Sequence, residues 1–191
     1  MDVFAFAGCR GRIAARHEGA LVPLVSCAPC FLCLLFKERL VAFNLSSPAF
    51  GDGGFLPAEF TCDGAGISPP LAWTDAPEGT RSFALVAHDP DVPSGDITHW
   101  LLFNLPGEAA HLPAGVDGEG VPGTNSEDAI GYLAPTPPPG DPAHRYIFTL
   151  YALSTDRLGL DDSARREALE NSFEDHLLAQ AQLVGLYARA R

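Results

Sequence analysis

The chain has 191 residues, 47% of them hydrophobic, and a formal net charge of -12 at pH 7. This length predicts one domain plus an extension, with enough apolar residues for a sizeable core. The excess of acidic residues argues against nucleic acid and against an anionic membrane surface as partners.

Residues 1–39 differ from the rest in charge and cysteine content. They carry five basic and three acidic residues, whereas the remainder carries seven and twenty-one. Four cysteines lie in this segment and only Cys62 lies beyond it, which excludes a disulfide-stapled main domain. We therefore predict an unmatched extension over residues 1–39 and one domain over residues 40–191. A domain that folds on its core alone suits the cytoplasm.

The extension has two readings. Residues 19–36 form an uncharged run after three arginines, which fits a signal for export or membrane anchoring. The run is short for a membrane helix and contains two prolines, so a disordered or mis-assigned start is the alternative. The cysteines at 27, 30 and 33 have iron–sulfur-like spacing, but the fourth ligand is missing, and no cofactor is predicted.

From residue 40 onward, short apolar segments alternate with turns rich in glycine and proline. Short or extended strands are expected at Leu40–Leu45 and Ser68–Trp73, and clearer ones at Phe83–His88 and Ile97–Asn104. The latter two flank a polar turn. Residues 106–142 read as a long loop. The segment Arg145–Leu153 is apolar on both faces, which is typical of a central strand covered on both sides.

The C-terminal part is predicted to be helical. Ser163–Asn171 is rich in helix formers, and Ser172–Asp175 has the form of a capping box. Leu177, Ala181 and Val184 then recur at helical spacing, so a second amphipathic helix is expected. Short strands with a helical end predict a β-sandwich with peripheral C-terminal helices.

Polar side chains at strand boundaries form the candidate site: Asp89 and Asp91, His99, and the group His144-Arg145-Tyr146. If the strands are neighbours, these groups meet at one end of the sandwich. Two imidazoles, a phenol and backbone N–H groups suit a small anion, and the prolines around them form rigid walls. The aspartates would fix the tautomers of the imidazoles and keep the rings charged.

Structural roles remain open for the same residues. Asp89-Pro90-Asp91 is also an ordinary turn, and His99 could be a half-buried histidine with its hydrogen bonds satisfied. Arg145 is as well suited to an ion pair with an aspartate as to a ligand contact. A metal site of two histidines and two aspartates is conceivable, but the proline-rich walls and the lack of closely spaced histidines argue against it.

Several motifs together resemble the phosphatidylethanolamine-binding protein family, and in particular its bacterial and archaeal Raf-kinase-inhibitor-like branch. They are Ser68-Pro69-Pro70-Leu71-Ala72-Trp73, Asp89-Pro90-Asp91-x-Pro93-Ser94, His99-Trp100, Pro137-Pro138, His144-Arg145-Tyr146-x-Phe148 and the segment from Asp175 to Arg189. The resemblance runs from about Phe43 to Arg189.

The resemblance implies a Greek-key β-sandwich with a small anion pocket at one end. By position, the wall of that pocket would consist of Asp89, Asp91, Pro93, His99, Pro137, His144 and Tyr146, with Tyr132 and Ala134 near the mouth. The sequence departs from the branch after Tyr132, where Leu133 and Ala134 replace the usual glycines. Their Cβ atoms would narrow the mouth or remove a left-handed backbone geometry.

The predicted function is that of a non-enzymatic binding protein that recognises a phosphate-like anion: a phospholipid headgroup, a phosphorylated small molecule or a phosphoprotein. The resemblance also implies a kinase or protease as a protein partner, and a homodimer. A protease inhibitor acting through the exposed 106–142 region is the alternative, and a hydrolase using the histidines and aspartates is a third hypothesis. No elbow motif identifies a serine nucleophile.

Overall fold

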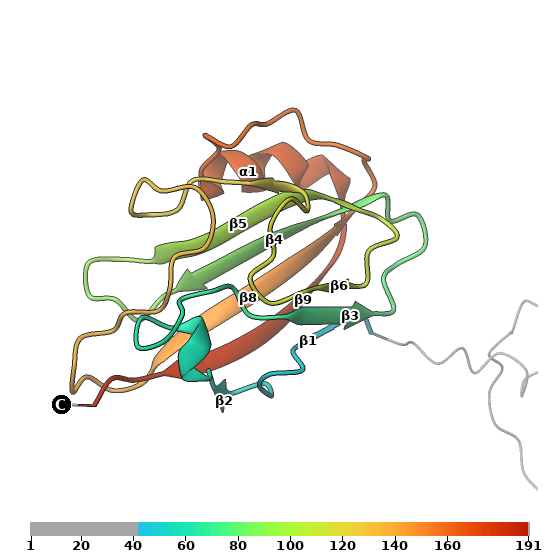
Figure 1. Cartoon of the computed structure of the whole chain (residues 1–191). Coiled ribbons are helices and arrows are strands. Elements are labelled where there is room, and N and C mark those ends of the chain that lie inside the picture. Colours follow the sequence, from blue (N-terminus) through green and yellow to red (C-terminus); the bar gives the residue numbers. More distant parts are fainter. Residues whose placement is uncertain (1–41, 191) are drawn as a thin grey trace, which may run out of the picture. The chain divides into compact units, whose positions relative to one another are not determined.

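The computed structural model describes residues 42–190, which form two β-sheets and one α-helix (Figure 1). The larger sheet has six strands in the order β2, β9, β8, β4, β5 and β7. In that order, the strands span Gly54–Phe55, Leu177–Tyr187, His144–Leu153, Ser82–Asp89, Ile97–Pro106 and Val121–Pro122. The smaller sheet consists of β1 (Asn44–Ser46), β3 (Leu71–Thr74) and β6 (His111–Leu112).

The two sheets enclose the main hydrophobic core. Inward-facing residues of β4, β5, β8 and β9 pack there against Leu45 of β1, Trp73 of β3 and Leu112 of β6. The rings of Trp73 and Phe83 meet edge to face at 5.3 Å. Two sheets that share one core form a β-sandwich, so the predicted fold class is confirmed.

Helix α1 (Arg166–Phe173) covers the other face of the large sheet (Figure 1). Its buried residues Leu169 and Phe173 join a second hydrophobic cluster that includes Ala84 and Val86 of β4. Since successive residues of a strand point to opposite faces, β4 contributes to both clusters and is buried along nearly its whole length. Strand β8 does the same, which confirms the prediction of a central strand.

The strands predicted at 83–88, 97–104 and 145–153 are confirmed as β4, β5 and β8. The predicted loop over residues 106–142 contains the two short strands β6 and β7. Two 3-10 helices, η1 (Ala58–Phe60) and η2 (Glu174–His176), complete the described elements.

The prediction of a second C-terminal helix is wrong. Residues Leu177–Tyr187 form β9, which pairs antiparallel with β8 from Leu177 opposite Leu153 to Tyr187 opposite His144. The helical spacing of Leu177, Ala181 and Val184 misled because the same segment also alternates, with buried residues at every second position from Ala181. Pairing along a long central strand overrides a weak local preference.

The apparent capping box is not used either. Ser172 lies within the last turn of α1, and its hydroxyl donates to the carbonyl of Leu169 at 2.7 Å. Within residues 42–190, no helix is long and apolar enough to cross a membrane. The expectations for residues 1–39 concern a segment outside the described part of the chain.

Candidate functional site

A β-bulge in β5 places His99. In the ladder between β4 and β5, Ala87 lies opposite Trp100 and His88 opposite Thr98, so His99 is the extra residue. Regular alternation would point His99 towards α1, like Leu101. The bulge instead turns it to the core side, where its ring meets Tyr146 edge to face at 5.1 Å.

Asp89 and His144 form a buried pair at the adjacent ends of β4 and β8. The distance from Asp89 Oδ2 to His144 Nδ1 is 2.7 Å, and the two side chains are 2% and 8% exposed. Asp89 Oδ1 accepts the backbone N–H of Asp91 at 2.8 Å. Asp89 therefore forms the turn and holds the histidine at the same time, so the two readings of this residue are compatible.

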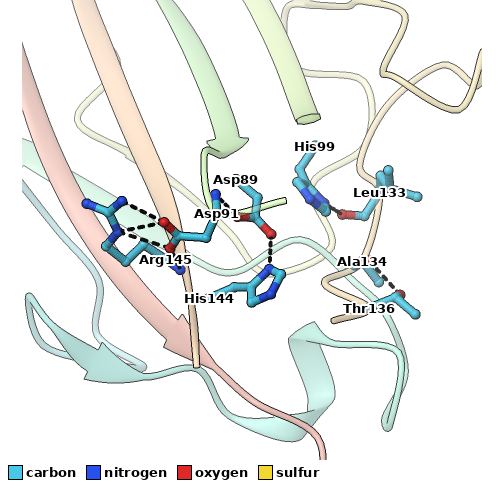
Figure 2. Close-up of polar contacts among 8 residues, drawn as sticks. All are labelled: Asp89, Asp91, His99, Leu133, Ala134, Thr136, His144 and Arg145. Atoms are coloured by element: carbon cyan, nitrogen blue, oxygen red, sulfur yellow. Dashed lines mark hydrogen bonds and ion pairs between the residues drawn. The ribbon is translucent and has the colours of Figure 1, made fainter. Parts of the chain in front are cut away.

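Asp91 holds the start of β8 rather than facing the cavity. Arg145 donates to both Asp91 oxygens, through Nη2 at 2.6 Å and Nε at 3.0 Å, and its backbone N–H donates at 2.9 Å. These hydrogen bonds lower the pKa of Asp91 to about 2. The structural ion pair considered for Arg145 is thus present, and it fixes the residue next to His144 (Figure 2).

A cavity of about 520 Å³ opens at this end of the sandwich. Figure 2 shows Asp89, His99 and His144 reaching into one region, with Leu133, Ala134 and Thr136 beside it. The lining consists of Asp89, Val92, Pro93, Ser94, Ile97, His99, Glu127, Leu133, Ala134, Thr136, Pro137, Pro138, His144 and Tyr146. The lining contains polar groups within a largely apolar, proline-rich wall, the usual make-up of a small-molecule site.

Of the predicted wall, the structure brings together Asp89, Pro93, His99, Ala134, Pro137, His144 and Tyr146. Asp91 and Tyr132 lie outside the lining. The hydroxyl of Tyr132 donates to the carbonyl of Phe60 at 2.8 Å, and its ring packs edge to face on Trp100 at 5.6 Å. Burial raises the pKa of Tyr132. Tyr132 therefore contacts Phe60 and Trp100, which also lie outside the lining.

Leu133 was expected near the mouth and Pro138 among the rigid prolines, but sequence reasoning missed Val92, Ser94, Ile97, Glu127 and Thr136. Most of these are direct neighbours of predicted residues, so extending each motif by a residue would have found them. Glu127 does not adjoin any predicted site residue, so no motif could have indicated it. Neither Leu133 nor Ala134 has a positive φ, so the backbone is not left-handed at these two positions, which is one of the two consequences expected from their Cβ atoms.

Both imidazoles are bound at Nδ1 to an acceptor. His99 Nδ1 lies 2.8 Å from the carbonyl oxygen of Leu133, and His144 Nδ1 lies against the Asp89 carboxylate. Because these oxygens can only accept, each Nδ1 carries a proton. Nε2 is therefore bare in the neutral ring, and it donates only when the ring is charged.

Burial has the largest effect on the pKa values of His99 and Tyr146. It lowers the pKa of His99, against the raising effects of the Leu133 carbonyl and Asp89. Burial and the neighbouring Asp89 charge both raise the pKa of Tyr146. Hence, His99 is neutral and Tyr146 protonated at pH 7, and the lining formed by residues 89–146 contains no lysine or arginine. Residues 42–190 contain no group of three or more histidine, cysteine or acidic side chains arranged to hold a metal ion.

Known proteins share this architecture. In solved structures, the chain matches a phosphatidylethanolamine-binding protein homologue from Chlamydia trachomatis with a TM-score of 0.74 and 37% identity, over 78% of this chain and 98% of that one. It matches YbcL of Escherichia coli, described as a member of the mammalian family, with a TM-score of 0.71 and 29% identity, over 76% and 98%.

Sequence relatives agree. A UPF0098 protein of Methanothermobacter thermautotrophicus is 43% identical over 152 residues, 76% of this chain and 99% of the relative. One from Aquifex aeolicus is 39% identical over 160 residues, 81% and 94% of the two chains. Residues 46–188 match the sequence model of the phosphatidylethanolamine-binding protein family. The chain therefore belongs to the phosphatidylethanolamine-binding protein family.

Proposed function

We propose that this protein is a non-enzymatic binding protein whose cavity recognises a phosphate-like anion. The observation that carries the proposal is the pair of imidazoles from separate strands, each anchored at Nδ1 and each lining the same cavity. Anchoring at Nδ1 leaves Nε2 as the nitrogen available to a ligand. Two charged imidazoles would give two N–H donors on a rigid frame, a pre-organised arrangement for anion oxygens.

Anion binding at this site requires proton uptake by His99. Neutral His99 and His144 present bare Nε2 atoms, which accept rather than donate, and Asp89 adds negative charge nearby. An anion that only accepts hydrogen bonds therefore binds the charged rings. Since burial lowers the pKa of His99, the ligand must stabilise the proton there, and affinity rises as the pH falls towards that pKa.

The size and composition of the cavity support a ligand larger than a bare anion. About 520 Å³ is within the range of organic ligands, and the apolar side chains Val92, Ile97, Leu133 and the prolines surround the polar groups. The shared chemistry is a phosphate monoester or diester. A phospholipid headgroup, a phosphorylated metabolite and a phosphorylated protein side chain are the sources to be distinguished.

The surroundings of the histidines support binding rather than catalysis. The Thr136 hydroxyl donates to the Ala134 carbonyl at 3.0 Å instead of to a histidine. Within residues 42–190, no serine, threonine or cysteine donates to His99 or His144, so no hydroxyl or thiol is placed for activation by a base.

Calorimetric titration tests the proposal. Sulfate, which does not titrate between pH 8 and pH 5, and phosphate are the first probes; phosphoethanolamine, phosphoserine and a phosphoserine peptide then separate the sources. Wild type is compared with the double variant His99→Ala with His144→Ala. The matched control is His111→Ala with His176→Ala, which removes two exposed histidines outside the lining.

The double variant is expected to lose about a hundredfold in affinity, because two hydrogen bonds to charged donors are removed. The control pair keeps the wild-type affinity. Equal affinity of the double variant and wild type for sulfate, phosphate and phosphoethanolamine would contradict the proposal.

A further inference from the structure

A second histidine-centred cluster lies on the face of the large sheet opposite the cavity. We call His88, Asp96, Arg166 and Glu170 the His88 cluster. Arg166, the first residue of α1, donates through Nη1 to His88 Nδ1 and to Asp96 Oδ2, both at 2.8 Å. Its Nε donates to Glu170 at 2.8 Å. One guanidinium thus joins the end of β4, the loop after it and α1.

The His88 ring has the tautomer opposite to that of the cavity histidines. A guanidinium only donates, so His88 Nδ1 must accept and its proton lies on Nε2. This Nε2 is buried and has no hydrogen-bond partner within the described residues. The ring is therefore held through Nδ1 alone, and it holds Arg166 only while it is neutral.

The cluster reaches the cavity through the loop that joins β4 to β5. Asp96 is the last residue of this loop, and Val92, Pro93 and Ser94 of the same loop line the cavity. Ile97, the residue directly after Asp96, also lines the cavity, and only Gly95 separates Asp96 from Ser94 of the wall, so a shift at Asp96 moves lining residues on both of its sides. The position of the wall consequently depends on the contact between Arg166 and Asp96.

We propose that neutral His88, together with Arg166, positions the β4–β5 loop, so that protonation of His88 weakens ligand binding in the cavity on the opposite face. A proton on Nδ1 would place two cationic donors 2.8 Å apart and remove the Arg166 contact. The charged ring would then compete with Arg166 for Asp96, whose Oδ2 already lies 3.4 Å from Nδ1. The inference rests on the proposed function.

The groups around His88 set the direction of its titration. Burial lowers its pKa most, and Arg166 and His99 lower it further, whereas Asp96 and Glu170 raise it, with a net lowering. Strand β8 adds the Tyr151 phenol, whose pKa is raised by burial and by the negative charge of Glu170. The ring is thus neutral at pH 7 and gains its proton only below the ordinary range of a histidine.

The test compares the pH profile of sulfate affinity in wild type and three variants. His88→Asn keeps an acceptor near the position of Nδ1 but cannot titrate. Arg166→Met removes the donor, and His111→Asn is the matched control. We expect wild type and His88→Asn to bind sulfate equally at pH 7.5, and wild type to bind it about fivefold more weakly than His88→Asn at pH 5, the equivalent of one lost hydrogen bond. Arg166→Met binds more weakly at both.

A readout on the ligand-free protein separates this inference from the proposed function. The amide NMR signals of Val92 and Ser94 should follow the titration of the His88 ring in wild type and lose that response in His88→Asn. Superimposable sulfate profiles of wild type and His88→Asn would overturn the inference. If wild type binds no sulfate, the proposed function fails, and the amide signals alone then decide the inference. It is overturned if the signals of Val92 and Ser94 follow the titration of the His99 ring instead of the His88 ring.

Discussion

The two faces of the large sheet at the end of β4 carry histidines with opposite chemistry. On the cavity face, His144 donates from Nδ1 to the Asp89 carboxylate. On the helix face, His88 accepts at Nδ1 from the Arg166 guanidinium. His88 and Asp89 are adjacent in the chain, yet strand alternation sends them to opposite sides. The difference shows that a partner across the fold, and not the residue type, decides which nitrogen carries the proton.

The contacts on the two faces also differ in burial. We therefore expect the free energy of unfolding to fall by different amounts when Asp89 or Arg166 is replaced. Asp89→Ala leaves the His144 Nδ1–H and the Asp91 N–H without their acceptor in a buried site. We expect a loss of about 3 kcal/mol in the free energy of unfolding, measured by urea denaturation. Arg166→Met, at a side chain that is 27% exposed, should cost about 1 kcal/mol. Similar losses for both variants would contradict the comparison.

Asp89→Asn should convert His144 to the tautomer that His88 has. The new amide oxygen can accept the Asp91 N–H, and its NH₂ group then faces His144 Nδ1, which must accept. Nε2 of the neutral ring would carry a proton and donate to an anion without proton uptake. The ring nitrogen chemical shifts of His144, measured by NMR, should place the proton on Nε2 in the neutral ring of the variant and on Nδ1 in that of wild type. A proton that stays on Nδ1 in the variant would show that Asp89 does not set the tautomer.

Asp91 gives a smaller effect with a clear pH window. Its pKa is lowered to about 2 by Arg145, so its contribution to stability is present above the unfolded-state pKa of about 4 and is lost as the pH falls towards 2. Asp91→Asn should lower the free energy of unfolding by about 1 kcal/mol at pH 7. Denaturation curves from pH 7 to pH 2 should converge with those of wild type at the acid end.

Tyr132→Phe should have the smallest effect. It removes one hydrogen bond to the Phe60 carbonyl and keeps the ring against Trp100, so we expect a loss of about 1 kcal/mol or less in the free energy of unfolding. Sulfate affinity should stay at the wild-type value, because neither Tyr132 nor its hydrogen-bond partner Phe60 belongs to the cavity lining. A large loss of affinity would place Tyr132 in the binding site itself.

Much of this site was accessible from the sequence because its residues lie at strand ends that the apolar pattern marks. Asp89 follows the run that forms β4, and His144 precedes the run that forms β8. Two long apolar strands in one sheet bring such ends together. Glu127 was missed because it lies in an irregular loop whose approach to the cavity depends on contacts such as that of Ser126 with Thr98.

By itself, the sequence determined the central strands, the turn at Asp89 and the family. Tertiary structure decided the rest: β9 is a strand because β8 offers it a full-length partner. His99 faces the core because a bulge adds one residue to β5, and the ring protons follow partners as distant in sequence as Leu133 and Arg166. Local patterns encode burial, whereas register and hydrogen-bond partners exist only once the strands have paired.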